Sequence, residues 1–274
     1  MSSWHSGSTW IGYVLGSTPR SAYLGEFHRP WDVGTAVPCT LCASRGLSAC
    51  SVLDGVDAVP ADHAFAAAAA RLPERVLVDN SKLVAWTRVF IGRPDIECRV
   101  VHAIKDPRGW LASVRRRAEV PLAAGLAHWV AENQAIRDFV VTNAIPTLTV
   151  AYDRLARAPT RRFRPVFSFC GIPYAASALK YWEHDHHGFA ANGASAAILA
   201  GAAPAHFRTG DEAFYQTRRR TQFSDDRWRR ELTPADDLAV RADAPTRDLL
   251  ASLGLRLTAT GLAPARKWWP WSDA

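Results

Sequence analysis

Residues 99–113 read RVVHAIKDPRGWLAS, and this stretch indicates the fold class. Residues 99–104 are a short apolar run of the kind that forms a strand buried on both faces. Asp106 and Pro107 then begin a helix, because proline is favoured in the first helical turn. A buried strand followed directly by a helix is typical of α/β proteins with a parallel sheet.

The same alternation continues on both sides of this stretch. We expect further strands at residues 75–79 and 146–151. We expect helices at residues 8–16, 62–72, 83–91, 106–117, 122–143, 161–170, 226–232 and 243–253. Residues 17–62 are rich in Gly, Pro, Ser and Cys, which predicts a loop, and residues 184–225 are expected to be irregular. The sequence therefore predicts an α/β fold with a parallel sheet.

The composition excludes several classes of protein. With 274 residues, 48% of them hydrophobic and 11 of them Trp, the chain is neither wholly disordered nor fibrous. No apolar run approaches the roughly 20 residues that a membrane helix needs. The first residues lack the basic and apolar regions of a secretory signal, so we expect a cytoplasmic protein. A net charge of +7 favours an anionic ligand, nucleic acid or an acidic surface, without choosing among them.

Lysine is rare in this chain. Only Lys82, Lys105, Lys180 and Lys267 stand among the 33 Lys and Arg residues. An ammonium group is a compact, rotatable donor that fits where a guanidinium does not. Lys82 and Lys105 both follow predicted strands, which makes them candidate functional residues.

The first turn of interest is residues 5–10, HSGSTW. In parallel sheets, ligands bind where strands end and helices begin. Gly7 allows close approach of the backbone, and Ser6, Ser8 and Thr9 add hydroxyl donors beside a helix N-terminus, which suits a phosphate or sulfate. The turn is not a Walker A loop. A helix capped by Ser or Thr is the alternative interpretation.

Two more turns follow predicted strands. The second is residues 79–82, DNSK, and the third is residues 104–108, IKDPR. Lys105 at the strand end and Ser113 two turns into the next helix can converge on one anion. A capped turn with a solvated cation is the alternative for each, but three such turns in this order favour a phosphate-binding protein.

The order HSGSTW, VLVDNSK, VVHAIKDPRGWLAS, LTVAYDRL and FSFCGI resembles the sulfotransferases that use 3'-phosphoadenosine-5'-phosphosulfate (PAPS), in particular their bacterial branch. The resemblance covers about residues 4–172 and, more loosely, 184–256. It implies a three-layer, P-loop-like fold with a central parallel sheet, and a single domain over residues 1–274. Within that domain, residues 20–62 would be an acceptor-side loop and residues 184–225 would lie near the nucleotide.

The resemblance also implies a reaction. The sulfuryl group would pass in line from PAPS to a hydroxyl or amine of a small metabolite or glycan, leaving adenosine 3',5'-bisphosphate. PAPS would be the co-substrate, and no metal would be required. We expect no nucleic-acid or membrane partner.

The nucleotide-binding residues are assigned by the same resemblance. Residues His5 to Trp10 would hold the 5'-phosphosulfate, and Lys105 and Ser113 would hold the 3'-phosphate. Asn192 would lie close to the nucleotide. Apart from the resemblance, Arg218 belongs to an arginine run at residues 218–220 that could close over the 3'-phosphate, and a solvated charge run is the alternative. The family usually has Arg or Lys at the position of His5 and Arg at the position of Lys105. Residues 152–155 resemble the family's YEDL segment.

Glu26 resembles the general base of tyrosylprotein and many bacterial sulfotransferases, where it follows a glycine as it follows Gly25 here. Apolar Phe27 and Trp31 beside it would raise its pKa towards a value suited to proton abstraction. A surface glutamate is the alternative interpretation.

His28 and Asp32 are alternative bases. His5 and Lys82 would stabilise the leaving group, since Lys82 stands where cytosolic aryl sulfotransferases have a catalytic His.

The acceptor is expected to contact four residues: His28, Trp31, Asp79 and Trp86. Trp31 and Trp86, together with Trp110, would form an aromatic pocket. A place in the hydrophobic core is the alternative for these tryptophans.

Three of the five cysteines cluster in the sequence, at Cys39, Cys42 and Cys50. A zinc site completed by His28 or His63 is one interpretation. Reduced, packed cysteines are the other, and it is preferred because only one CxxC is present. Metal binding by residues 184–187, HDHH, is disfavoured because sulfuryl transfer needs no metal.

Two other functions stay open. A P-loop-like kinase would use ATP, but the Walker lysine and a Mg²⁺-binding carboxylate beside the first turn are missing. A basic nucleic-acid-binding protein would explain the charge, but arginine is spread along the chain rather than gathered on one element.

Overall fold

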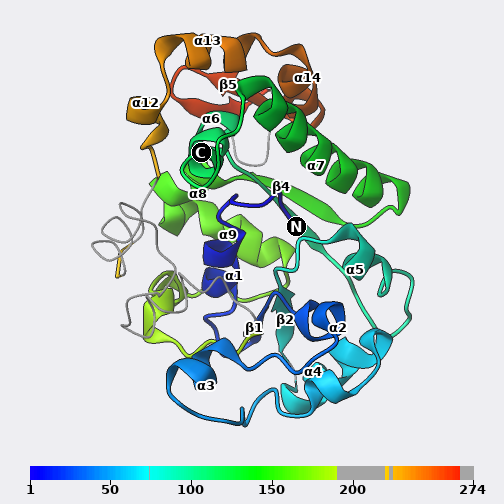
Figure 1. Ribbon diagram of the computed structural model, residues 1–274. Coiled ribbons are helices and arrows are strands. Elements are labelled where there is room, and N and C mark those ends of the chain that lie inside the picture. The colour runs from blue at the N-terminus through cyan, green and yellow to red at the C-terminus, as the bar shows by residue number, and fades with distance from the viewer. Residues whose placement is uncertain (74, 190–219, 222–224, 266–274) are drawn as a thin grey trace. The chain divides into compact units, whose positions relative to one another are not determined.

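The computed structural model describes residues 1–73, 75–189, 220–221 and 225–265 (Figure 1). The chain divides into two units. Unit 1 comprises Met1–Gly7, Cys98–Arg162 and Phe223–Ala274, and unit 2 comprises Ser8–Glu97 and Phe163–Gln222. The two units are described separately. The prediction of a single domain over residues 1–274 stays a prediction.

Unit 1 contains a parallel strand pair. Strand β3 (Val100–Ile104) pairs with β4 (Thr147–Ala151) in continuous register. The N-terminal residues run beside β3, because Ser2 forms a parallel bridge with Ala103 and the Ala103 N–H donates to the Met1 carbonyl at 3.0 Å. The residues before the first turn therefore lie alongside β3 as a neighbouring strand would, although they form only a single β-bridge with it.

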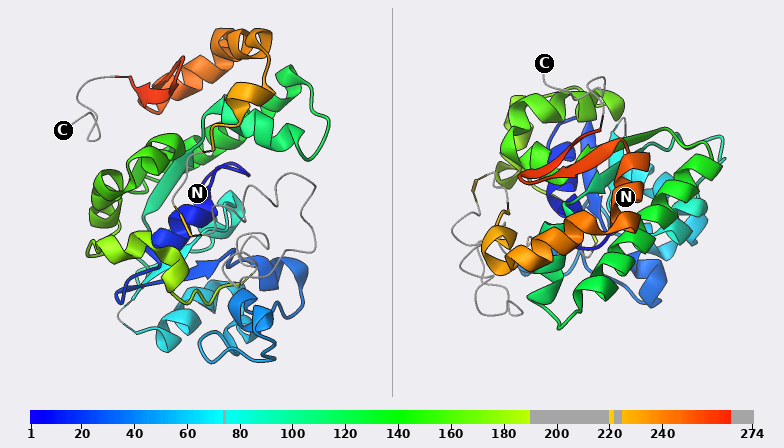
Figure 2. Two further views of the ribbon diagram at one scale, coloured as in Figure 1. Left: turned by 90° about the vertical axis from the view of Figure 1, so that its left-hand side faces the viewer. Right: turned by 90° about the horizontal axis from the view of Figure 1, so that it is seen from above.

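The helices of unit 1 are α6 (Pro107–Arg115), α7 (Leu122–Thr142), α8 (Tyr152–Arg157), α12 (Trp228–Glu231), α13 (Pro234–Ala242) and α14 (Ala244–Ser252). Strands β5 (Leu255–Thr258) and β6 (Gly261–Pro264) form an antiparallel hairpin. Helix α7 packs against α6 and α14, and β5 lies beside α14 (Figures 1 and 2). The core between these elements is built from large apolar side chains, among them Trp110, Trp129 and Leu250.

Local sequence explains where these helices begin. The Asp106 side chain caps α6 by accepting the Arg108 backbone N–H, and Pro107 occupies its first turn. Thr233 and Asp236 form a reciprocal capping box at the start of α13. The expected helices at 106–117, 122–143, 226–232 and 243–253 correspond to α6, α7, α12 and α14. Helices α8 and α13 and the β5–β6 hairpin were not expected.

Unit 2 contains the second parallel pair. Strand β1 (Ser21–Gly25) pairs with β2 (Val76–Asp79), and helix α1 (Ser8–Leu15) packs against both. The prediction that residues 17–62 form a loop is wrong here. They contain β1 and the short helices α2 (Arg29–Val33) and α3 (Thr40–Ser44), with 3₁₀ turns at Val56–Ala58 and Ala61–His63. Packing against α1 and pairing with β2 make β1 a strand despite its loop-like flanks.

Helices α4 (Ala64–Arg71) and α5 (Val84–Arg88) complete the central part of unit 2, and 3₁₀ turns lie at Ala176–Leu179 and Tyr181–Glu183. The boundary between the units falls within helix α9 (Pro159–Phe169). The core of unit 2 is aromatic, with Phe27 in contact with Trp31, Phe65 and Trp86. Cys39, Cys42 and Cys50 are buried in this same core.

The structure is thus of the mixed α/β class, with a two-stranded parallel sheet in each unit. None of the helices in the described ranges combines the length and apolar content needed to cross a bilayer.

Candidate functional site

Lys105 directly follows strand β3 and is buried inside unit 1. Its Nζ lies 3.8 Å from Asp225 Oδ2. The same carboxylate accepts hydrogen bonds from Arg227 at 2.8 and 3.0 Å and lies 3.4 Å from Arg116. Three cationic side chains therefore surround one carboxylate. We call Lys105, Arg116, Arg227 and Asp225 the cation cluster.

Burial and neighbouring charges have opposite effects on the pKa values of Lys105 and Asp225. Burial lowers the pKa of Lys105, and the charges of Asp225 and Asp153 oppose that change. Burial by itself would raise the pKa of Asp225, but hydrogen bonds from Arg227 and the nearby cations lower it to about 2. Asp225 is thus ionised at neutral pH and offsets one of the three positive charges.

Ser113 lies on α6, two turns beyond the start of the helix, and is buried. Arg117 donates to the Ser113 hydroxyl at 3.0 Å and to the Ser113 carbonyl at 2.6 Å. The neighbouring Arg108 is also buried, but it is bound on all sides by Asp106, Asp237 and the Thr258 carbonyl. Of the two basic residues in the KDPR segment, Arg108 therefore supports the fold, and Lys105 belongs to the cation cluster.

The opening turn and Lys105 share one neighbour within unit 1. Gly7 has a φ of +78°, and a Cβ at this position would lie 2.2 Å from the Tyr152 ring. Lys105 Nζ lies 5.8 Å from the centre of the same ring. Tyr152 begins the segment that resembles YEDL, so this segment packs between the glycine of the turn and Lys105.

Other contacts fix the shape of the opening turn. The Trp110 indole N–H donates to the Trp4 carbonyl at 2.6 Å, and the hydroxyls of Ser3 and Ser6 lie 2.6 Å apart. His5 has a φ of 61°, an uncommon conformation for a residue with a side chain. Trp110 is therefore a core residue that holds the turn, and its contacts fit the core alternative rather than an acceptor pocket.

The second half of the turn belongs to unit 2. Ser8 begins α1, and the Thr9 hydroxyl accepts a hydrogen bond from the Asn80 amide at 3.2 Å. Trp10 packs edge-to-face on Phe163. Asn80 also donates to the Tyr23 hydroxyl at 2.9 Å, so the residue after β2 ties together α1 and β1.

Glu26 and Lys82 meet in unit 2. Lys82 Nζ lies 2.5 Å from Glu26 Oε1, and both side chains are almost wholly shielded from solvent. Gly25 makes this position of Glu26 attainable, because its φ is +75° and a Cβ there would lie 2.2 Å from the Phe189 carbonyl oxygen. The candidate base thus has a candidate catalytic cation as its direct partner.

Asp79 holds the loop that carries Glu26. Its carboxylate accepts hydrogen bonds from the Phe27 and Ser81 backbone N–H groups, the Ser81 hydroxyl and the Trp86 indole N–H, at 2.5 to 3.2 Å. Burial raises the pKa of Asp79, and these hydrogen bonds act in the opposite direction. Because four donors occupy the carboxylate, its geometry fits a positioning role better than direct contact with an acceptor.

The other predicted acceptor residues lie close together. Trp31 stacks on Trp86 with ring centres 5.3 Å apart, and its indole N–H donates to the Val59 carbonyl. His28 is buried 6.4 Å from the Trp86 ring, and burial lowers its pKa. Its Nδ1 finds no hydrogen-bond partner among the described residues. Asp32, an alternative base, pairs with Arg29 at the surface.

The cysteine cluster is completed by a residue of the histidine-rich segment 184–187, for which metal binding was disfavoured from the sequence. His187 lies beside Cys39, Cys42 and Cys50, whereas His63 is exposed and pairs with Asp62. His28 and His63, the two candidates that the zinc interpretation named for the fourth ligand, are not part of the group. The other missed residues are Arg116, Asp225 and Arg227. Asn192 and Arg218 lie outside the described residues.

No family model matches this chain, and no curated protein matches it by sequence. Among solved structures, it is similar to the sulfotransferase domain of the Synechococcus PCC 7002 olefin synthase, with a TM-score of 0.58 and 18% identity over 92% of each chain. It is also similar to the sulfotransferase domain from the curacin biosynthetic pathway, with a TM-score of 0.57 and 14% identity over 92% of this chain and 95% of that one. The chain therefore has the fold of sulfotransferase domains.

Proposed function

We propose that this protein is a sulfotransferase that moves the sulfuryl group of PAPS to a hydroxyl or amine of a small metabolite or glycan. The observation that carries the proposal is the cation cluster beside the opening turn. Both lie in unit 1, and Tyr152 contacts Gly7 and neighbours Lys105. The fold shared with two sulfotransferase domains supports the same conclusion.

The cation cluster suits the 3'-phosphate of the nucleotide. Three cationic side chains gather here in a shielded place, where Asp225 contacts all three and Glu231 pairs with Arg116. Several cationic donors close together suit a phosphate, because hydrogen bonds between charged groups are stronger than those between neutral groups. Ser113 and Arg117 would add donors on the same helix, while His5, Ser6 and Gly7 would contact the 5'-phosphosulfate through the turn.

Glu26 and Lys82 supply the proton chemistry in this proposal. Glu26 takes the proton from the acceptor hydroxyl or amine, and the acceptor atom then forms a bond to sulfur. The bond from sulfur to the 5'-phosphate oxygen breaks, and its electron pair leaves with adenosine 3',5'-bisphosphate. Lys82 Nζ, 2.5 Å from Glu26 Oε1, would hold the carboxylate in position for this step.

His28, Trp31 and Trp86 would form the acceptor side. Trp31 and Trp86 stack within the aromatic core of unit 2 and would form the apolar wall behind the acceptor, and the Nδ1 of His28, which has no hydrogen-bond partner among the described residues, would offer it one polar contact. The two sulfotransferase domains of similar fold come from biosynthetic systems, which favours a small metabolite as the acceptor.

Calorimetric titration with three ligands tests the proposal. We expect adenosine 3',5'-bisphosphate to bind in the micromolar range or tighter, ATP to bind more weakly, and single-stranded DNA to give no comparable signal. Equal or tighter binding of ATP would favour a kinase. Strong binding of DNA without a bisphosphate signal would favour a nucleic-acid-binding protein. Either result rejects the proposal.

A further inference from the structure

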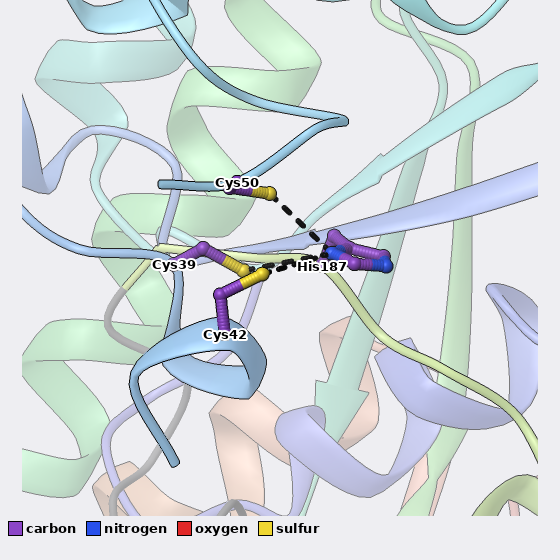
Figure 3. Close-up of side chains that lie close together, drawn as sticks. All are labelled: Cys39, Cys42, Cys50 and His187. Atoms are coloured by element: carbon purple, nitrogen blue, oxygen red, sulfur yellow. Dashed lines mark hydrogen bonds between the residues drawn. The ribbon is translucent and has the colours of Figure 1, made fainter. Parts of the chain in front are cut away.

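Four side chains converge in unit 2 from three parts of the sequence. The Nδ1 atom of His187 lies 3.8 Å from Cys39 Sγ, 3.6 Å from Cys42 Sγ and 3.4 Å from Cys50 Sγ. All four ligand atoms lie within 4.8 Å of one another. Figure 3 shows the three sulfurs and this one ring nitrogen turned towards a common point.

Hydrogen bonding alone does not explain this arrangement. A single ring nitrogen donates one proton or offers one lone pair, so it satisfies one sulfur at a time. A tetrahedral Zn²⁺ site with bonds of about 2.3 Å to sulfur and about 2.05 Å to nitrogen places each sulfur about 3.6 Å from the nitrogen. The three separations, 3.4 to 3.8 Å, lie on both sides of that value.

We propose that Cys39, Cys42, Cys50 and His187 bind one Zn²⁺ ion as a structural site. Three thiolates and one imidazole are a known closed ligand set for zinc, with no position left for water or substrate. Soft sulfur ligands in a tetrahedral arrangement select zinc over the hard divalent cations. The site stands apart from the proposed sulfuryl transfer and does not depend on it.

The backbone around the ligands keeps them in place. The Leu53 N–H donates to Cys50 Sγ at 3.3 Å, which suits a metal-bound thiolate. The Thr40 N–H donates to the Gly188 carbonyl at 2.9 Å, so the CxxC turn is joined to the residue after His187. Arg45 and Asp185, just outside the ligands, form a two-pronged ion pair at 2.5 and 3.1 Å.

The metal site would brace the segment that carries Glu26. Two residues after His187, the Phe189 N–H donates to the Leu24 carbonyl, and the Phe189 carbonyl accepts from the Glu26 N–H, both at 2.9 Å. An ion bound by His187 would therefore fix residues 187–189, whose backbone is hydrogen-bonded to Leu24 and Glu26. Residues 39–50, of which Thr40–Ser44 form α3, would be anchored by the same ion.

Metal analysis of the full-length protein, purified with reductant, tests the site. We expect close to one zinc per chain by elemental mass spectrometry. After replacement of zinc by Co²⁺, we expect the intense visible bands and thiolate charge-transfer absorption of tetrahedral sulfur coordination. His187→Cys should keep one metal per chain and change the cobalt spectrum to that of four thiolates. Cys170→Ser, a matched change of a unit 2 cysteine outside the proposed ligand set, should leave both readouts unchanged.

The bracing role has its own readout. Removal of zinc by a strong chelator should speed hydrogen exchange in peptides that contain Glu26 and Phe189. An unchanged exchange rate in the metal-free protein would overturn the bracing role.

The site itself would be overturned if reduced wild-type protein supplied with Zn²⁺ held only trace metal and gave no cobalt bands. An intact mass showing two hydrogens lost to a disulfide among these cysteines would overturn it as well.

Discussion

The surroundings of Lys105 in unit 1 and of Lys82 in unit 2 differ in their ionic contacts, although each lysine follows a strand and is shielded from solvent. Lys105 shares the Asp225 carboxylate with two arginines, so three cationic groups gather at one place. Lys82 contacts the Glu26 carboxylate at 2.5 Å. Clustered cationic donors suit a phosphate, whereas a lysine in contact with a carboxylate can position that carboxylate for catalysis.

This difference predicts that binding and turnover can be separated by mutation. Changes near Lys105 should weaken nucleotide binding, and changes to the Glu26–Lys82 pair should reduce turnover at unchanged nucleotide affinity. The predictions below run from the largest expected effect to the smallest.

Glu26→Gln should give the largest effect. Loss of a general base typically costs about 10²- to 10⁴-fold in rate, and we expect kcat for PAPS-dependent sulfation to fall by that amount. The affinity for adenosine 3',5'-bisphosphate should change by less than about twofold, because Glu26 is not among the residues assigned to the nucleotide. Glu183→Gln, which changes an exposed carboxylate of unit 2, is the control and should retain full turnover. Normal turnover of the Glu26→Gln variant would exclude Glu26 as the base.

Gly7→Ala should destabilise the protein. The new methyl group would lie 2.2 Å from the Tyr152 ring and the residue would keep a left-handed φ. Together these costs should lower the free energy of unfolding by about 2 to 4 kcal/mol. Gly34→Ala is the matched control, since Gly34 has a φ of +65° and, apart from its chain neighbours, no atom of the described residues lies within 4 Å of an added Cβ. The Gly34→Ala variant should lose only about 1 kcal/mol of its free energy of unfolding. Equal losses in urea denaturation would show that Tyr152 does not confine the turn.

The pH dependence of nucleotide binding should show a smaller effect. Only the charged form of Lys105 attracts a phosphate, and burial lowers the pKa of Lys105 below its ordinary value of 10.5. Affinity for adenosine 3',5'-bisphosphate should therefore be full at low pH and fall as the pH rises through this lowered pKa. Lys105→Arg should bind within a few fold of wild type at neutral pH and lose this decline, because arginine stays charged. A decline of the same size in the Lys105→Arg variant would assign it to another group.

The parallel strands after the first were predictable because each is a short apolar run that ends at a turn. Strands β2, β3 and β4 and helices α6 and α7 lie close to the residues expected for them. Strand β1 was not predictable, because its five residues lie within a segment whose composition is typical of loops. The tertiary partners of β1, helix α1 and strand β2, make it a strand.

The candidate site was predictable where it depends on chain order. Lys105 could be named because it follows a predictable strand, and Glu26 because it follows a glycine, as the general base does in the sulfotransferases that the sequence resembles. Asp225 and Arg227 could not, since they lie more than a hundred residues from Lys105 in an arginine-rich chain. His187 was similarly hidden, although three cysteines without a fourth ligand and a histidine-rich segment were both visible in the sequence.

The most direct test of the central claim asks whether Lys105 binds the 3'-phosphate of the nucleotide. Adenosine 3',5'-bisphosphate and adenosine 5'-monophosphate differ only in the 3'-phosphate, and both can be titrated into wild-type protein and Lys105→Ala by calorimetry. For wild type, we expect the bisphosphate to bind about 10- to 100-fold more tightly, the worth of a charged hydrogen bond. In Lys105→Ala that preference should largely vanish, while Lys180→Ala, which changes an exposed lysine, should retain it. An undiminished preference in Lys105→Ala would contradict the assignment of the 3'-phosphate to the cation cluster.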